Sequence, residues 1–354
     1  MRVACNSGHD PVAVRPVTLA LEGGGSMGAF TWGVLDRLLD VPGLRIGVVS
    51  GTSAGAMNAA MLVQGLATGG PPAAKRLLET FWRRVAIASG SLPGPVGTWM
   101  HLVGGAIAPV VDVMRHTGAA LKPGVGPTSH NPLRAILTEL LDPRVFGSPS
   151  APELVVAATR VRTGEAWLFR DAEVTVDAPL ASACLPQLFP AIEIDGEAYW
   201  DGGYTSNPPL RPLIETGAPP DVLIVRAKPL ARPGTPTGAI AVQERVNEIT
   251  FGSALRGELR TLAVAQAMLA GVPDLPPTLA RLHMIGAEAE FQAMPGGSRL
   301  DPTWAFLSEM HELGFKTAAR WVAGNLHAVG TRSSLDLSLF AGAVRNTRTG
   351  TSTA

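Results

Sequence analysis

Three short segments of the chain combine residue types that could do chemistry together. They are Leu19–Gly28, which contains the run Gly23-Gly24-Gly25, Val48–Gly55, which contains Ser53, and Trp200–Gly203, which contains Asp201. Amides in a glycine run can hold an anion, a serine can act as a nucleophile, and an aspartate can take the serine proton. These groups are most of what hydrolysis of an acyl ester needs.

The segment around Ser53 has the spacing G-x-S-x-G, with Gly51 and Gly55 on either side of the serine. It follows an apolar strand and precedes a helix, which is the context in which this motif presents a nucleophile on a sharp turn. The amino end of the following helix also favours negative charge beside the serine. A tight turn without chemistry is the alternative, and the placement of the motif favours a nucleophile.

Gly23, Gly24 and Gly25 follow a strand and precede a helix, so we expect their amides to form an oxyanion hole. With Gly28 they also match G-x-G-x-x-G, the pattern of a dinucleotide-binding loop. That interpretation needs an acidic residue at the end of the second strand, where this chain continues into the serine segment. The chain also lacks the Gly-Lys-Ser/Thr of a phosphate-binding loop, so we expect no nucleotide cofactor.

Asp201 ends a predicted strand and is followed by Gly202 and Gly203. A free aspartate has a pKa of ~3.9 and is a weak base for a hydroxyl. Partial desolvation and direct contact with Ser53 would make it an effective one. An aspartate that caps the amides of its own turn is the alternative. The presence of the other two segments favours the base.

Strand and helix patterns alternate along the chain and must position these residues. We predict strands at 17–21, 46–49, 153–161, 165–170, 191–194, 197–200, 221–226 and 281–285, and helices at 26–39, 54–66, 73–85, 132–141, 179–184, 242–269 and 302–326. The early strand–helix–strand–helix order predicts an α/β fold in which helices flank a central, mainly parallel sheet.

We expect a single domain over residues 16–343, with a flexible arm at 1–15 and a disordered tail at 344–354. Within the domain, residues 86–131 form a glycine- and proline-rich insert that we interpret as a cap or lid beside the site. A meandering surface excursion is the alternative. Apolar residues of the insert, such as Trp99 and Ile107, could contact a lipid interface or cover the core.

The chain has 354 residues, 46% hydrophobic, with a formal net charge of +0, which favours a folded core and disfavours nucleic-acid binding. Its two cysteines, Cys5 and Cys184, cannot form a disulfide framework, and no metal-ligand spacing is present, so we expect no metal and no cofactor. It shows neither a signal-peptide pattern nor a long apolar run. We expect a cytoplasmic protein, with transient peripheral contact with a membrane surface as an option.

The three segments together resemble those of the patatin-like phospholipase family, the patatin-like lipid acyl hydrolases. Ser182-Ala-Cys-Leu-Pro186 and Asn207-Pro208 resemble the family's stretches before and after its Asp-Gly. The resemblance implies the patatin-like fold and a Ser–Asp dyad without histidine, in which Ser53 attacks a lipid ester and Asp201 accepts and returns the proton. It also implies that the amides of Gly24 and Gly25 hold the oxyanion while Gly23 shapes the turn. Supporting positions are Gly28, Gly51, Gly55, Gly202 and Gly203. The implied enzyme is a carboxylic ester hydrolase of the phospholipase A, lysophospholipase or carboxylesterase type.

One position departs from the pattern of many bacterial members, which carry Arg or Lys in the glycine loop where this chain has Met27. The missing cation weakens the case for an anionic phospholipid and makes neutral acyl esters more plausible.

Two other functions are open. An α/β-hydrolase would use a Ser-Asp-His triad in that chain order, and His283 follows Asp201 in a strand-like stretch. Its apolar neighbours Leu282 and Met284 favour a histidine of the core. A lipid-binding protein of the same fold without catalysis is the second alternative, and the presence of both Ser53 and Asp201 argues against it.

Overall fold

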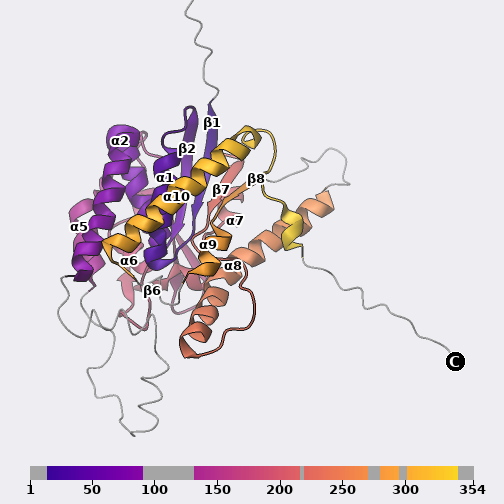
Figure 1. Ribbon diagram of the computed structural model, residues 1–354. Helices are drawn as coiled ribbons and strands as arrows, with labels where there is room; N and C mark the ends of the chain where they lie inside the picture. Colours follow the sequence, from indigo (N-terminus) through magenta and orange to yellow (C-terminus); the bar gives the residue numbers. More distant parts are fainter. Residues whose placement is uncertain (1–13, 91–130, 216–218, 270–279, 295–300, 342–354) are drawn as a thin grey trace, which may run out of the picture.

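The computed structural model describes residues 14–90, 131–215, 219–269, 280–294 and 301–341. Over these residues, helices cover both faces of one eight-stranded sheet (Figure 1). The strands are β1 Arg15–Leu21, β2 Leu44–Thr52, β3 Glu153–Arg160, β4 Ala166–Arg170, β5 Ile192–Ile194, β6 Glu197–Asp201, β7 Asp221–Val225 and β8 Arg281–Ile285. The α-helices are α1 Gly28–Leu38, α2 Ala54–Gly90, α5 Pro132–Leu140, α6 Asp177–Ser182, α7 Arg211–Glu215, α8 Ala239–Leu269, α9 Glu288–Ala293 and α10 Trp304–Asn325.

The strand order across the sheet is β5-β6-β3-β2-β1-β7-β8, with β4 also paired to β3. The pairs from β3 through β2, β1 and β7 to β8 are parallel, whereas β4 and β6 pair with β3 in the antiparallel direction. The predicted α/β class and its mainly parallel sheet are confirmed. Because carboxyl ends of parallel strands share one edge, loops that follow β1, β2 and β7 meet there.

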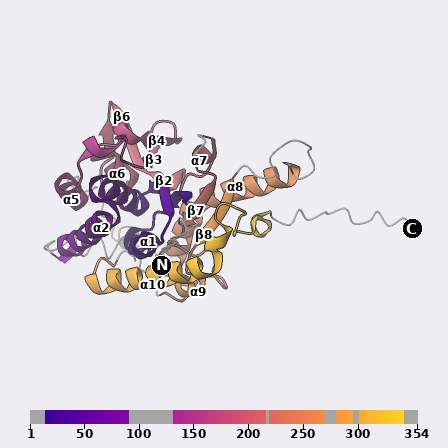
Figure 2. The same ribbon diagram turned by 90° about the horizontal axis from the view of Figure 1, so that it is seen from above.

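Alternate residues of each strand face opposite layers of the molecule, as the pleat of a strand requires. Val17, Leu19 and Leu21 of β1 join the larger core cluster, which contains residues of α1, α2 and α10. Ala20 faces the smaller cluster, built with residues of α7 and α8. Seen from above, α1, α2 and α10 lie on one side of the sheet and α7 and α8 on the other (Figure 2). The sheet is therefore buried on both faces, which explains its nearly continuous apolar strands.

Helix α2 differs from the prediction in one respect. Its two helical stretches meet at a kink where Gly69 and Gly70 leave helical geometry, as the predicted break between two helices requires. The second stretch, however, continues to Gly90 because Ala86 and Ala88 still pack on the core. Residues 86–90 are thus helix and not part of an irregular insert. Residues 91–130, and with them the predicted cap, lie outside the described residues.

The ends of the domain differ slightly from the predicted boundaries. Strand β1 begins at Arg15, whose backbone N–H donates to the carbonyl of Gly43 at 2.7 Å, so the last residue of the predicted arm is already paired. Residues 1–13 and the predicted tail 344–354 lie outside the described residues. The hairpin of β5 and β6 turns at Asp195 and Gly196, which both have positive φ, as a tight turn at Asp-Gly predicts.

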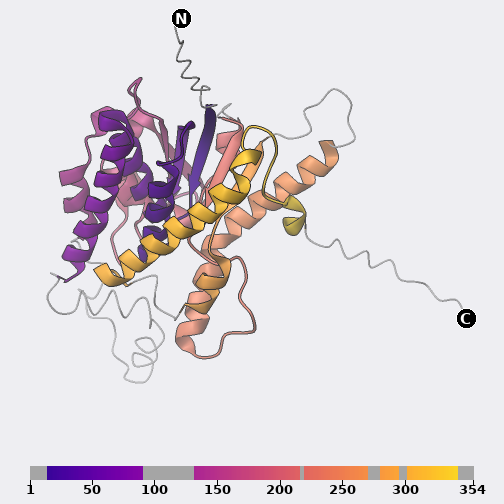
Figure 3. The same cartoon turned by 45° about the horizontal axis from the view of Figure 1, so that its top comes forward.

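Helix α8 is long, with 31 residues, and extends past the body of the sheet (Figure 3). Residues of its amino-terminal half, Gln243, Asn247 and Phe251, line the same cavity as Gly24. This half therefore reaches the edge of the sheet where the strand ends and the glycine loop meet. Across that edge, residues from α2 and α5 line the opposite part of the cavity.

Candidate active site

Ser53 stands on the turn between β2 and α2 with a φ of 55°, a conformation that a serine seldom adopts. Its backbone N–H donates to the hydroxyl of Ser182 at 2.8 Å, which helps to hold the strained turn. The two glycines of the motif are tightly packed. A Cβ atom at Gly51 would lie 2.4 Å from the carbonyl oxygen of Gly55, and one at Gly55 would lie 2.2 Å from that of Leu21. The sequence therefore builds the sharp strand-to-helix turn that the motif predicts.

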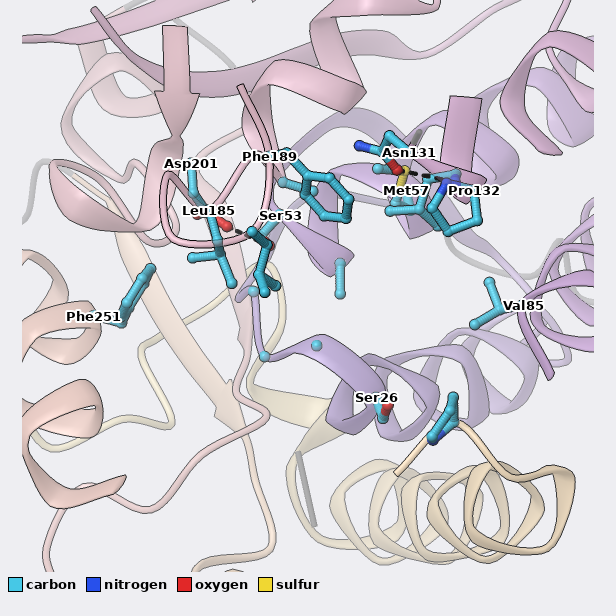
Figure 4. Close-up of a pocket in the computed structure, with 18 of the residues that line it drawn as sticks. Ser26, Ser53, Met57, Val85, Asn131, Pro132, Leu185, Phe189, Asp201 and Phe251 are labelled. Carbon is cyan, nitrogen blue, oxygen red and sulfur yellow. Dashed lines mark hydrogen bonds between the residues drawn. The ribbon is translucent and has the colours of Figure 1, made fainter. Parts of the chain in front are cut away.

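The hydroxyl of Ser53 donates to Oδ2 of Asp201 at 2.8 Å (Figure 4). Strand β3 lies between the two residues, because Thr52 pairs with Ala157 and Asp201 pairs with Ala158. The chain can pass closely over β3 after Asp201 because Gly202 has no side chain. A Cβ atom at Gly202 would lie 2.2 Å from the carbonyl oxygen of Ala157. Two residues that the sequence separates by nearly half of the chain are thus in direct contact.

Asp201 is almost completely buried, with 2% of its surface exposed. Its Oδ1 accepts the backbone N–H of Gly203 at 2.7 Å, which leaves Oδ2 for the serine. Burial raises the pKa of Asp201 to about 6, against the opposing effect of the hydrogen bonds from Gly203 and Ser53 and of the charge of Lys228. The carboxylate is therefore ionised at neutral pH and is a much stronger base than an exposed aspartate.

The glycine loop after β1 lies beside the serine turn. The backbone N–H of Gly23 donates to the side-chain oxygen of Asn207 at 2.7 Å, so this amide is already engaged and Gly23 acts as a turn residue. Gly25 has a φ of 61°, which turns the chain at the start of the short 3-10 helix before α1. Within the described part of the chain, the amides of Gly24 and Gly25 have no hydrogen-bond partner, and both residues line the same cavity as Ser53.

Two further predicted glycines bring other elements up to the dyad. A Cβ atom at Gly28 would lie 2.7 Å from the Cβ of Ala54, so the amino ends of α1 and α2 meet beside the serine. Gly203 packs against the ring of Phe251 from α8, where a Cβ atom would lie 2.1 Å from the ring. The positive ends of two helices therefore lie close to the place where negative charge would develop in a reaction.

A cavity of about 250 Å³ opens over Ser53, and apolar side chains dominate one part of it. These apolar residues are Met57, Phe81, Trp82, Val85, Leu133, Ile136, Leu185, Leu188 and Phe189. None of the described residues that line the cavity is a histidine. The walls fit a hydrocarbon chain better than a polar substrate.

His283 lies elsewhere, on β8, and its side chain is completely buried. Its Nε2 is 3.1 Å from a carboxylate oxygen of Asp221, and its Nδ1 is 2.9 Å from the hydroxyl of Ser334. Burial, against the opposing effect of Asp221, lowers the pKa of His283. Both ring nitrogens are thus engaged in a separate cluster, as expected for a histidine of the core. The structure does not bring His283 into contact with Ser53 or Asp201.

Two residues that support the site were not assigned a role from the sequence. Ser182 receives the amide of Ser53, and Asn207 receives the amide of Gly23, so each fixes one of the two loops. Both lie in the stretches whose resemblance to the family was noted around Asp201. The signal was therefore present, but only the contacts give these side chains a function.

The sequence corresponds to a known class of proteins. The profile of the patatin-like phospholipase family matches residues 19–214, more than half of the chain. The chain belongs to this family. Membership implies lipid acyl hydrolase activity, and a lipid as the substrate.

Comparison with individual proteins adds little to the family assignment. Among solved structures, the chain is similar to VipD from Legionella pneumophila, with 17% identity, coverage of 87% of this chain and 67% of that chain, and a TM-score of 0.39. Among curated proteins, no sequence matches. No helix in the described ranges is both long and apolar enough to cross a bilayer.

Proposed function

We propose that the chain cleaves carboxylic ester bonds of lipids with a Ser–Asp dyad. Ser53 is the nucleophile, Asp201 is the base, and the amides of Gly24 and Gly25 hold the oxyanion. The observation that supports this proposal most is the 2.8 Å hydrogen bond from the hydroxyl of Ser53 to a buried carboxylate. The reaction belongs to the carboxylic ester hydrolases, of which phospholipase A, lysophospholipase and carboxylesterase are the types considered.

The reaction has two halves. In the first, the hydroxyl of Ser53 gives its proton to Oδ2 of Asp201 while its oxygen attacks the ester carbonyl carbon. The tetrahedral oxyanion lies against the amides of Gly24 and Gly25, and the protonated Asp201 then donates its proton to the leaving alcohol. In the second half, Asp201 takes a proton from water, the resulting hydroxide attacks the acyl-enzyme, and Ser53 recovers its proton as the fatty acid leaves.

The shape of the cavity supports a fatty acyl ester as the substrate. Phe189, Met57 and Val85 lie on one side of Ser53 in the close-up, and Phe251 lies on the other (Figure 4). An acyl chain could lie along the apolar side with its carbonyl at Ser53 and its alcohol toward Phe251. A family member that binds lipid without catalysis would not need a serine hydroxyl hydrogen-bonded to a buried carboxylate beside the apolar cavity, so we favour the enzyme.

The test is a panel of p-nitrophenyl acyl esters and phospholipid vesicles, with wild type and Ser53→Ala assayed side by side. We expect hydrolysis of the longer acyl esters and a loss of ~10⁴-fold or more in kcat with Ser53→Ala. A fluorophosphonate probe should label the wild type and not the variant. Folded wild type that neither hydrolyses an ester nor reacts with the probe would instead support a binding protein.

A further inference from the structure

A positively charged side chain enters the cavity from the loop that follows β7. Because β7 pairs in parallel with β1, with Val225 opposite Leu21, this loop lies beside the glycine loop. Lys228 lines the cavity together with Ser53 and Gly24. A Cβ atom at Gly24 would lie 3.6 Å from Cε of Lys228, so the lysine side chain runs directly past the proposed oxyanion hole.

The backbone around Lys228 is firmly positioned. The carboxylate of Glu22, only 2% exposed, accepts the N–H of Ala227 at 2.8 Å and so ties the lysine loop to the residue before the glycine run. The guanidinium of Arg226, which is 4% exposed, donates to the carbonyl oxygen of Lys228 at 2.5 Å. Both anchoring side chains are buried. The backbone of the lysine loop is thus held by buried side chains, and Lys228 itself is half-buried.

Lys228 gives the cavity its positive charge. Among the described residues that line the cavity, the charged side chains are Asp201 and Lys228, and Asp201 is engaged by Ser53 and Gly203. The ammonium of Lys228 lies 5.1 Å from the centre of the Phe251 ring, which is a cation–π distance. A charge near an apolar wall acts more strongly than one in open water.

The cavity is divided into two parts on either side of Ser53. Apolar side chains such as Val85 and Met57 lie on one side, and Phe251 lies on the other (Figure 4). Gln243 and Asn247, from the same helix as Phe251, also line the cavity. If the acyl chain occupies the apolar part, the alcohol part of the ester extends toward Phe251 and therefore toward the ammonium of Lys228.

We infer that Lys228 is a specificity-determining residue, which recognises an anionic phosphate on the alcohol side of the scissile ester. This inference rests on the proposed function of Ser53 and Asp201. Lys228, on the loop after β7, supplies a cation in place of the Arg or Lys that many bacterial members carry where this chain has Met27. The inference therefore favours an anionic phospholipid over the neutral esters that Met27 alone indicated. The phosphate of a glycerophospholipid is a few bonds from its ester groups, which places the two groups in one cavity.

The test compares Lys228→Met with wild type on two soluble substrates that share a hexanoyl group. Dihexanoylphosphatidylglycerol carries the phosphate, and p-nitrophenyl hexanoate does not; both are used as monomers, so attraction to a membrane plays no part. We expect kcat/KM for the phospholipid to fall ~10- to 100-fold, mainly through KM, which is the range for loss of one charged hydrogen bond. Both assays are run well above the pKa of Asp201, which burial raises to about 6, so that Asp201 is ionised with or without the charge of Lys228. Any remaining effect on the reaction centre is common to both substrates, so the readout is the ratio of the two kcat/KM values, which should fall ~10-fold or more.

Two control variants isolate the charge. Lys228→Arg should keep most of the phospholipid activity, and Lys316→Met, which removes an exposed lysine of α10, should leave both substrates unaffected. Equal losses for both substrates with Lys228→Met would mean that the lysine acts on the reaction centre, and no loss would mean that it does not contact substrate; either overturns the inference. Wild type active on the p-nitrophenyl ester alone would also overturn it but leave the proposed dyad standing. Wild type inactive on both would count against the dyad itself.

Discussion

Two buried aspartates in this molecule have opposite surroundings. Asp201 and Asp221 are exposed by only 2% and 1%, and each touches a hydroxyl or an imidazole as a catalytic carboxylate would. Asp201 lies at the edge of the sheet that holds the glycine loop. Asp221 is the first residue of β7. It lies at the opposite end of that strand from Val225, which pairs with Leu21 just before the glycine loop. Burial is therefore common to both, and their partners differ.

Asp221 has an excess of partners. Arg281 donates to both of its oxygens, at 2.9 and 2.6 Å, and the amide of Gly330 and the ring of His283 also contact it. Burial raises the pKa of Asp221, but Arg281, Gly330 and His283 outweigh burial, and the net direction is downward. This carboxylate keeps its charge and does not give useful basicity.

Among the described residues, the side chain of Asp201 accepts hydrogen bonds from the amide of Gly203 and the hydroxyl of Ser53, and the charge of Lys228 has a smaller effect on it than burial. Burial therefore dominates and raises its pKa to about 6. The comparison shows that depth alone does not identify a base. A buried carboxylate becomes a proton acceptor where its neighbours leave its charge undercompensated, and becomes a structural anchor where a cation compensates it.

The largest effect should come from Asp201→Asn. An amide cannot accept the serine proton, so we expect kcat to fall by ~10³- to 10⁴-fold. Stability should not fall. An acid whose pKa rises on folding from 3.8 to about 6 destabilises the folded state above pH 6, by about 3 kcal/mol at this shift. Urea unfolding at pH 7.5 should thus give a free energy of unfolding at or above that of wild type.

Asp221→Asn should lower the stability of the protein and leave its activity nearly unchanged. Loss of the carboxylate leaves Arg281 without its ionic partner, so we expect a decrease of about 3 kcal/mol in the free energy of unfolding. The kcat/KM per folded molecule should remain close to that of wild type. Asp142→Asn, which removes an exposed partner of Arg144, is the matched control and should leave the unfolding midpoint nearly unchanged. If Asp221→Asn instead stays stable but loses activity, the proposed difference between Asp201 and Asp221 is wrong.

The smallest effect is in the pH profile. Asp201 must be ionised to accept a proton, so kcat/KM should fall ~10-fold per pH unit below its pKa, which burial raises to about 6, and level off above it. A histidine base could give a similar midpoint, so the measurement is repeated with His283→Asn. We expect the acid limb to persist, because both nitrogens of His283 are engaged with Asp221 and Ser334. If His283→Asn loses both the acid limb of the profile and its activity, a Ser-Asp-His triad would be supported instead.

The sequence predicts the parts of this molecule whose determinants are local. The turns at Ser53 and at Asp195-Gly196 follow from glycine spacing and strand context, and the structure has both. The apolar strands and the break in α2 at Gly69 follow equally directly. Helix α2 continues beyond the predicted end because Ala86 packs on the core, which the local glycine and proline content does not reveal.

The candidate site is less accessible from the sequence because its contacts join distant strands. The residue types of the three segments suggested that Ser53 and Asp201 could act together, and the resemblance to a family implied a dyad without histidine. Their contact, however, depends on the register of three strands. Asn207 engages the amide of Gly23, which no spacing indicates. Lys228 lies in no motif, so the sequence gives no signal for it, and it reaches the cavity because β7 is the neighbour of β1.

The position of β1 between β2 and β7 determines how much of the chain a folded fragment with the candidate site must contain. Recognisable family sequence stops at residue 214, yet β7 and β8 lie beyond that boundary and complete the sheet beside the strand that leads into the glycine loop. A fragment cut at the boundary would carry the proposed nucleophile and base but expose one edge of β1 to solvent. A shortened version of this protein should therefore keep the whole sheet, because the family match ends at residue 214, before β7 and β8.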